Sequence, residues 1–194
     1  MMPRTLIFLL LCLPLLCRAE ATTTTWGPTQ LMQDLAQVKI AKATFTERKF
    51  LSVLNRPLES SGTLLFQSPG HLEKHTLKPK AESLVLDQGV LTIDIPARNV
   101  KRTLVLQEYP AVWAFVESIR STLAGDLPTL ERFYKIVLDG DAARWKLRLL
   151  PLDSGTRAVM REIRISGRGD RVDSIETFES NGDHASMDVL EDAP

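Results

Sequence analysis

The sequence predicts a mainly β protein of the α+β class, in which one antiparallel sheet curls strongly or closes into a barrel and carries a few helices. Three observations predict this fold class. Apolar and polar residues alternate with a period of two along most of the chain, turn-forming motifs recur at near-regular intervals, and two segments show helical spacing instead. We expect one domain, because 194 residues suit a single core and no linker or repeat interrupts the chain.

The first residues are typical of a cleaved secretory signal. Arg4 supplies a positive charge, residues 6–17 are twelve positions without a charge, and Ala19-Glu20-Ala21 places small residues at a cleavage site. We therefore expect a signal peptide over residues 1–21 and a mature domain over residues 22–194.

Two other interpretations of the N-terminus stay open. A retained membrane anchor is one, although the apolar run is short for a spanning helix. A lipoprotein signal ending at Cys17 is the other, although Leu16 stands where a small residue is expected.

Both cysteines, Cys12 and Cys17, precede the predicted cleavage site. The mature protein would then have no thiol, which excludes a disulfide scaffold, a cysteine nucleophile and a thiolate metal site.

The charge balance argues against a nucleic-acid-binding protein. The chain has 24 Lys and Arg residues against 24 Asp and Glu residues, whereas phosphate binding requires a basic surface. With 44% hydrophobic residues over its 194 positions, the chain can build a core of its own.

The mature chain begins with one helix and continues as strands. Pro28 suits a first helical turn, and Leu31, Leu35 and Val38 form one apolar stripe of a helix of about three turns. From residue 43 the period becomes two, as in the alternating segment Trp145-Lys146-Leu147-Arg148-Leu149. We expect ten or eleven strands, which lie near residues 43–51, 60–66, 71–77, 83–87, 90–95, 101–106, 134–139, 144–151, 159–166, 172–179 and 184–190. So many short strands cannot form one flat sheet, which predicts strong curling.

Residues 110–132 interrupt the strands with helical spacing. The helix expected over residues 111–123 carries an apolar stripe flanked by two aromatic residues; the stripe is Val112, Val116, Ile119 and Leu123, and the aromatics are Trp113 and Phe115. A break at Ala124-Gly125-Asp126 allows a second, shorter helix to begin near Leu127-Pro128.

One histidine-rich strand is the only candidate metal site that the pattern offers. His71, Glu73 and His75 share one face of a predicted strand, which makes a zinc site possible in principle. Lys74, Lys78 and Lys80 lie close by in the sequence and would repel a cation. A solvated outer strand face is therefore the favoured interpretation, and we expect no metal and no cofactor.

The sequence gives little support for a catalytic function. An acyl hydrolase would need His71, His75 or His184 to face the interior beside a hydroxyl or carboxylate, and the alternation places His71 and His75 outside. The adhesion-like tripeptide Arg168-Gly169-Asp170 stands where a hairpin turn is needed, so we interpret it as a turn. We expect no catalytic residue, and thus a binding protein rather than an enzyme.

Several segments resemble the LolA family of periplasmic lipoprotein carriers. The family pattern is a first strand with a Phe, a G-x-L strand, a Pro at the next turn, and a P-x-x-E-x-hydrophobic strand that ends in D-G. The matching segments of the first half are residues 35–45, 60–66 (SSGTLLF), Ser68-Pro69, 77–79 (LKP) and 82–89 (ESLVLDQG). Those of the second half resemble the LolA-related branch and are residues 109–110, 123–126 (LAGD), 130–132, 145–149 (WKLRL) and 181–183 (NGD).

This resemblance implies an unclosed β-barrel of roughly eleven strands with helices as a lid. It implies a monomeric periplasmic carrier that takes the acyl chains of a lipoprotein from an inner-membrane transporter to an outer-membrane acceptor, without catalysis or a cofactor. A carrier of another lipid, such as a glycolipid or a polyene lipid, is the alternative. A domain with a filled core and no pocket is a further alternative, and composition alone favours it.

Two features depart from the family pattern. Relatives have an Arg immediately before the Pro that opens the third strand, where it holds the lid closed; this chain has Ser68. The lid is therefore expected to be held mainly by apolar contact. The inward-facing set of the third strand is Leu72, Lys74 and Thr76, where relatives usually present aromatic residues.

We expect one set of apolar side chains to line a hydrophobic cavity, because alternation and helical spacing turn them inward. The set is Phe45, Leu64, Phe66, Leu72, Leu91, Ile93, Trp113, Val116, Ile119, Trp145, Leu147 and Leu149.

Overall fold

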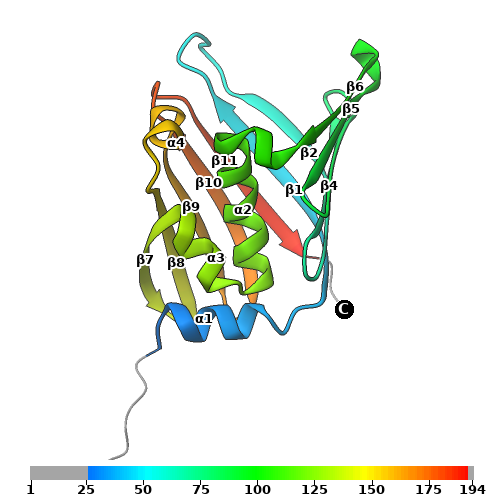
Figure 1. Ribbon diagram of the computed structural model, residues 1–194. Helices are drawn as coiled ribbons and strands as arrows, with labels where there is room; N and C mark the ends of the chain where they lie inside the picture. The colour runs from blue at the N-terminus through cyan, green and yellow to red at the C-terminus, as the bar shows by residue number, and fades with distance from the viewer. Residues whose placement is uncertain (1–25, 192–194) are drawn as a thin grey trace, which may run out of the picture.

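A computed structural model of the chain, which describes residues 26–191, contains one curled antiparallel sheet of eleven strands (Figure 1). The strand order is β6-β5-β4-β3-β2-β1-β11-β10-β9-β8-β7, so β6 and β7 are the two free edges and the barrel is not closed. This confirms the predicted fold class. The predicted signal peptide and its cleavage site lie outside the described residues.

The strands agree with the alternation in the sequence, and their ends differ from the predicted ends by a few residues at most. They are β1 (Ile40–Phe50), β2 (Leu58–Gln67), β3 (His71–Lys78), β4 (Glu82–Asp87), β5 (Val90–Ile95), β6 (Val100–Val105), β7 (Tyr134–Asp141), β8 (Arg144–Pro151), β9 (Met160–Arg168), β10 (Arg171–Glu179) and β11 (His184–Glu191). Consecutive strands pair as hairpins, and the pairing of β1 with β11 joins the two halves of the sheet. The Arg168-Gly169-Asp170 tripeptide falls at the β9–β10 hairpin turn, with Gly169 at a φ of 55°.

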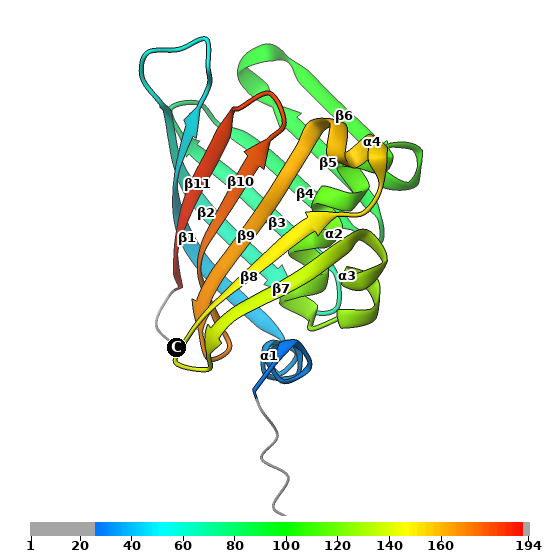
Figure 2. The ribbon, with the colours of Figure 1, turned by 90° about the vertical axis from the view of Figure 1, so that its left-hand side faces the viewer.

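The helices lie on the concave side of the sheet and at both of its ends (Figures 1 and 2). They are α1 (Pro28–Leu35), α2 (Pro110–Ala124), α3 (Leu127–Phe133) and α4 (Ser154–Val159), with short 3-10 helices η1 (Pro96–Arg98) and η2 (Leu106–Glu108). Helix α1 is shorter than the predicted three turns. Helix α4 is absent from the prediction because its six residues bury only Thr156 and show no apolar stripe.

Local capping sets where the central helices end and begin. Helix α2 ends at Gly125, whose φ of 67° favours glycine and whose position leaves no room for a side chain. A Cβ atom there would lie 2.1 Å from the carbonyl oxygen of Met32, so the glycine allows α1 to approach α2. Asp126 then begins α3 by accepting a hydrogen bond from the backbone N–H of Thr129 at 3.1 Å.

A packed core fills one half of the concave side. It lies between strands β7–β10 and helices α1–α3; its fully buried members include Leu31, Leu35, Leu130, Tyr134, Trp145, Leu147, Leu149, Ile163 and Ile165. Within residues 26–191, no helix combines the length and the apolar character needed to cross a membrane.

Candidate functional site

The other half of the concave side encloses a cavity of about 580 Å³. Strands β1–β5 and β9–β11 form its wall, and one face of α2 covers it. Its size falls in the range of about 300–1,000 Å³ that small-molecule sites occupy. The face contributed by α2 consists of Val112, Phe115, Val116, Ile119 and Leu123. This arrangement encloses an apolar volume that can hold a hydrocarbon chain.

The structure places most of the predicted lining residues on this cavity. They are Leu64, Phe66, Leu72, Leu91, Ile93, Val116 and Ile119. Phe45 lies on the same face of β1 as the cavity-lining Ala43 and Glu47, and only 2% of its surface is exposed. Its ring lies 4.8 Å from the ammonium nitrogen of Lys74, which does line the cavity.

The remaining predicted residues lie elsewhere. Trp145, Leu147 and Leu149 belong to the packed core under the helices, so they fill space rather than border it. Trp113 contacts the ring of Phe133 in α3 edge-on, with the ring centroids 5.3 Å apart. Alternation turns strand residues toward the concave side in both halves of the sheet, and the position of the helices decides which half is filled.

Several lining residues were not in the predicted set. Leu84 and Leu86 of β4 and Met187 and Val189 of β11 line the cavity. Each pair is spaced by two within a strand that the sequence predicts, so the period-two pattern was the available signal. The register of β3 and β4 shows which residues of β4 share the inward face, since Leu84 lies directly opposite Lys74 and Leu86 opposite Leu72.

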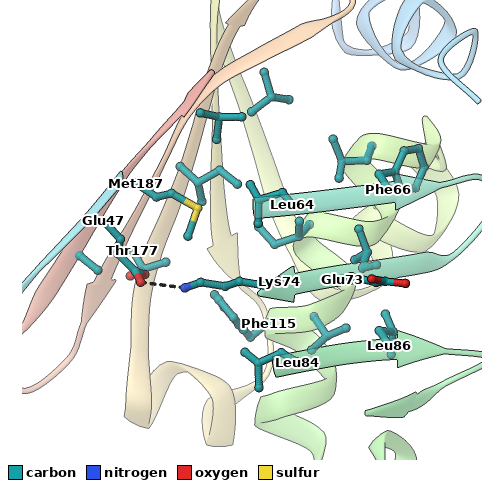
Figure 3. A pocket seen from close by; sticks show the side chains of 18 of the residues that line it. Glu47, Leu64, Phe66, Glu73, Lys74, Leu84, Leu86, Phe115, Thr177 and Met187 are labelled. Carbon is teal, nitrogen blue, oxygen red and sulfur yellow. Dashed lines mark hydrogen bonds and ion pairs between the residues drawn. The ribbon is translucent and has the colours of Figure 1, made fainter. Parts of the chain in front are cut away.

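Charged groups also line the cavity (Figure 3). Lys74 extends from β3 across the cavity, and its ammonium nitrogen lies 2.7 Å from a carboxylate oxygen of Glu47 on β1. Glu47 also accepts a hydrogen bond from the hydroxyl of Ser60 at 3.2 Å. A second pair lines the same cavity, with Lys49 3.6 Å from Glu179. Of the inward set predicted on β3, Leu72 and Lys74 both reach the cavity.

A polar contact joins α2 to the sheet beside Ser68. The guanidinium of Arg120 donates a hydrogen bond to the carbonyl oxygen of Pro69, 3.1 Å away, in the β2–β3 turn. It also pairs with Glu117 at 2.7 Å and with Asp126 at 3.1 Å. The lid is thus held by more than the apolar contact that the sequence predicted, because an arginine reaches from the helix to the turn.

The hydrogen bonds of this cluster keep it ionised. Burial alone would lower the pKa of Arg120, but hydrogen bonds to Glu117 and Asp126 raise it above its ordinary value. Burial alone would likewise raise the pKa of Asp126, but hydrogen bonds from Thr129 and Arg120 hold it below its usual range.

The histidine-rich strand forms a small hydrogen-bonded cluster of its own. Glu73 lies 2.7 Å from a ring nitrogen of His71 and 2.6 Å from one of His75. The hydrogen bond to Glu73 raises the pKa of His71, and the hydrogen bonds from both histidines lower the pKa of Glu73. Within the described part of the chain, no three His, Asp or Glu side chains are arranged to hold a metal ion. His184 stacks on Phe50, with the ring centroids 4.5 Å apart.

Comparison with known proteins identifies a family. A family described as "Outer membrane lipoprotein carrier protein LolA-like" matches residues 20–192 of the chain. No curated protein matches the chain significantly.

The solved structures that match the chain are distant in sequence. A LolA superfamily protein from Nitrosomonas europaea is 10% identical over 86% of this chain and 94% of its own, with a TM-score of 0.42. The MucA/MucB complex of Pseudomonas aeruginosa gives 13% identity over 86% of this chain and 57% of the matched chain, with a TM-score of 0.47. LprF from Mycobacterium bovis gives 10% identity, 86% and 93% coverage and a TM-score of 0.35.

Proposed function

The chain belongs to the LolA-like family of outer membrane lipoprotein carrier proteins, and from this membership we propose that it is a carrier for acyl chains. In this proposal it shields the acyl chains of a lipoprotein while the cargo crosses the periplasm from the inner to the outer membrane. The chain would be exported by a signal peptide cleaved after Ala21 and act as a monomer. An inner-membrane transporter would load it, an outer-membrane acceptor would unload it, and it would catalyse no reaction.

The apolar cavity is the observation that carries this proposal. Each buried methylene contributes about 0.8 kcal/mol, so exposing a sixteen-carbon chain to water costs on the order of 12 kcal/mol. A lipid with more than one such chain would not cross an aqueous compartment at a useful rate without a carrier. A cavity between a sheet and a helix supports this role, because movement of one helix would admit and release a chain.

A second candidate is a carrier of a lipid other than a lipoprotein. The charged groups in the lining favour it, since Lys74 occupies a strand position where an apolar side chain would suit a purely hydrocarbon cargo. A glycolipid or a polyene lipid would place a polar portion beside these charged groups.

Two measurements test the carrier function. Mass spectrometry of the protein purified from its own cell envelope should find a co-purifying lipid or lipoprotein. A fluorescent fatty acid should bind the purified protein, and Val116→Asp should reduce its affinity at least about tenfold, because the carboxylate would be desolvated against the chain. Val53→Asp is the matched control, because Val53 is 85% exposed in the β1–β2 loop. The proposal fails if the parent protein yields no lipid and binds no apolar probe.

A further inference from the structure

The two ion pairs in the cavity occupy the end of the barrel far from α1. Glu47 lies seven residues beyond the start of β1, roughly 23 Å along the strand at about 3.3 Å per residue. Lys49 follows on the same face of the strand, and the two pairs come from β1, β3 and β10. Both views place α1 at the opposite end of the barrel from the β1–β2 loop (Figures 1 and 2). Apart from Glu73, whose carboxylate is hydrogen-bonded to His71 and His75, the charged residues that line the cavity gather at this end.

These charged groups still contact solvent. The side chains of Lys74 and Glu47 are 24% and 23% exposed, and those of Lys49 and Glu179 are 46% and 31% exposed. A purely hydrocarbon ligand that filled this end would remove four charged groups from water and offer them no new partner. Removing the water that these ion pairs still contact is costly, because the desolvation of both charges can exceed their mutual attraction. A ligand with a polar group at this end would avoid that cost.

The charges of the two ion pairs balance. Two lysines face two glutamates, so these four groups add no net charge, and each already has a partner of opposite sign. A ligand with a single charge could pair with one side of the cluster only by leaving a group of the other sign unpaired. A head group that carries both charges can exchange partners with an existing pair and leave no charge over.

We infer that this end of the cavity binds the head group of a zwitterionic acyl lipid, whose acyl chain lies in the apolar part. Lys74 and Lys49 donate hydrogen bonds to the anionic group of the head, and the carboxylates of Glu47 and Glu179 form ion pairs with its cationic group. The ring of Phe45 beneath the Lys74 ammonium holds that side chain in the cavity, since the nitrogen lies 4.8 Å from the ring centroid. This inference rests on the proposed carrier function in its second form, a carrier of a lipid other than a lipoprotein, and names the class of that lipid.

Four amphiphiles with the same twelve-carbon chain test the inference by calorimetric titration below their micelle-forming concentrations. They are dodecylphosphocholine (zwitterionic), dodecyl sulfate (anionic), dodecyltrimethylammonium (cationic) and dodecanol (uncharged). Dodecylphosphocholine should bind about tenfold more tightly than each of the others, because only its head group can pair with the lysines and with the glutamates at the same time. Equal affinities, or tightest binding of another probe, would overturn the head-group assignment and leave the carrier function intact. Failure of all four to bind would instead overturn the carrier function itself.

Substitutions test whether the preference for dodecylphosphocholine arises at the two ion pairs. Lys74→Met keeps a long side chain without the ammonium and should abolish the preference for dodecylphosphocholine while dodecanol binds at least as well as to the parent. Glu47→Gln should abolish the preference as well, and it serves where Lys74→Met reduces folding as judged by circular dichroism. Lys42→Met is the matched control, because Lys42 is an exposed residue on the other face of β1. A preference that survives in folded Lys74→Met or Glu47→Gln would show that the head group binds elsewhere.

Discussion

Replacing Arg120 by Met removes the polar contact between α2 and the β2–β3 turn while keeping a similar aliphatic stem. The substitution deletes the hydrogen bond to the carbonyl oxygen of Pro69 and the ion pairs with Glu117 and Asp126. It leaves in place the apolar face of α2 that covers the cavity. The variant therefore separates the polar hold on the lid from its apolar contact.

The cost follows from the burial of the partners. Removing one member of a buried ion pair costs about 3–5 kcal/mol, because the other charge is left without compensation. The side chains of Arg120 and Glu117 are 18% and 11% exposed, so some solvation remains. The lower figure is therefore expected, a loss of about 3 kcal/mol in the free energy of unfolding. In a domain of this size such a loss lowers Tm by roughly 6–12 °C.

Urea unfolding and hydrogen exchange of the α2 amides give the two readouts. Arg120→Met should unfold at lower urea concentration, and its α2 amides should exchange faster than those of the parent. Adding Glu117→Gln to this variant replaces the stranded carboxylate by a neutral amide and should restore part of the stability. It cannot restore the contact with Pro69, so exchange in α2 should stay fast. Arg120→Lys, which keeps the charge without the fork of donors, should lie between the parent and Arg120→Met.

The pattern of exchange decides whether the contact holds the lid. If amides of β8 and β9 in Arg120→Met accelerate as much as those of α2, the substitution weakens the whole domain and Arg120 does not act on the lid. The same conclusion holds if the double variant returns α2 exchange to the parental rate.

Three further predictions concern stability. Hydrogen bonding from Arg164 and Arg148 lowers the pKa of Glu162 below its ordinary 4.5. The contribution of Glu162 to the free energy of unfolding is therefore present above pH 4.5 and disappears as the pH falls through the lowered pKa. Glu162→Gln should destabilise the protein to urea at pH 7, and the difference from the parent should shrink below pH 4.5. Gly62→Ala should cost at least about 2 kcal/mol in urea unfolding, because its Cβ would lie 1.9 Å from a backbone carbonyl oxygen of β3; an unchanged midpoint would contradict that steric reading. Leu149→Ala should cost about 3 kcal/mol in the closed core, but Leu64→Ala only about 1 kcal/mol, because Leu64 already borders empty space; equal costs would argue against a division between core and cavity.

The strands could be predicted because their signal is local. A strand with one dry and one wet face must alternate, and Trp145-Lys146-Leu147-Arg148-Leu149 does so whatever lies above it. Helix α2 could be predicted equally well, since its apolar stripe has helical spacing and Gly125 marks its end. Helix α4 could not be predicted, because its residues bury almost nothing. It depends instead on the Asp153 cap, whose carboxylate accepts a hydrogen bond from the backbone N–H of Thr156 at 2.7 Å.

The division of the concave side into a filled and a hollow half could not be predicted from alternation. Leu149 and Leu64 carry the same side chain and follow the same period, yet one lies in the core and the other lines the cavity. The difference arises from helix placement, because α1 and α3 cover β7–β10 while the wall formed by β2–β5 faces mainly the side of α2. Lys74 was the exception, since a lysine in an inward position already indicates that water or a polar ligand reaches it. A filled core would have to bury that ammonium completely, whereas in this cavity the Lys74 side chain keeps 24% of its surface exposed and its ammonium pairs with Glu47.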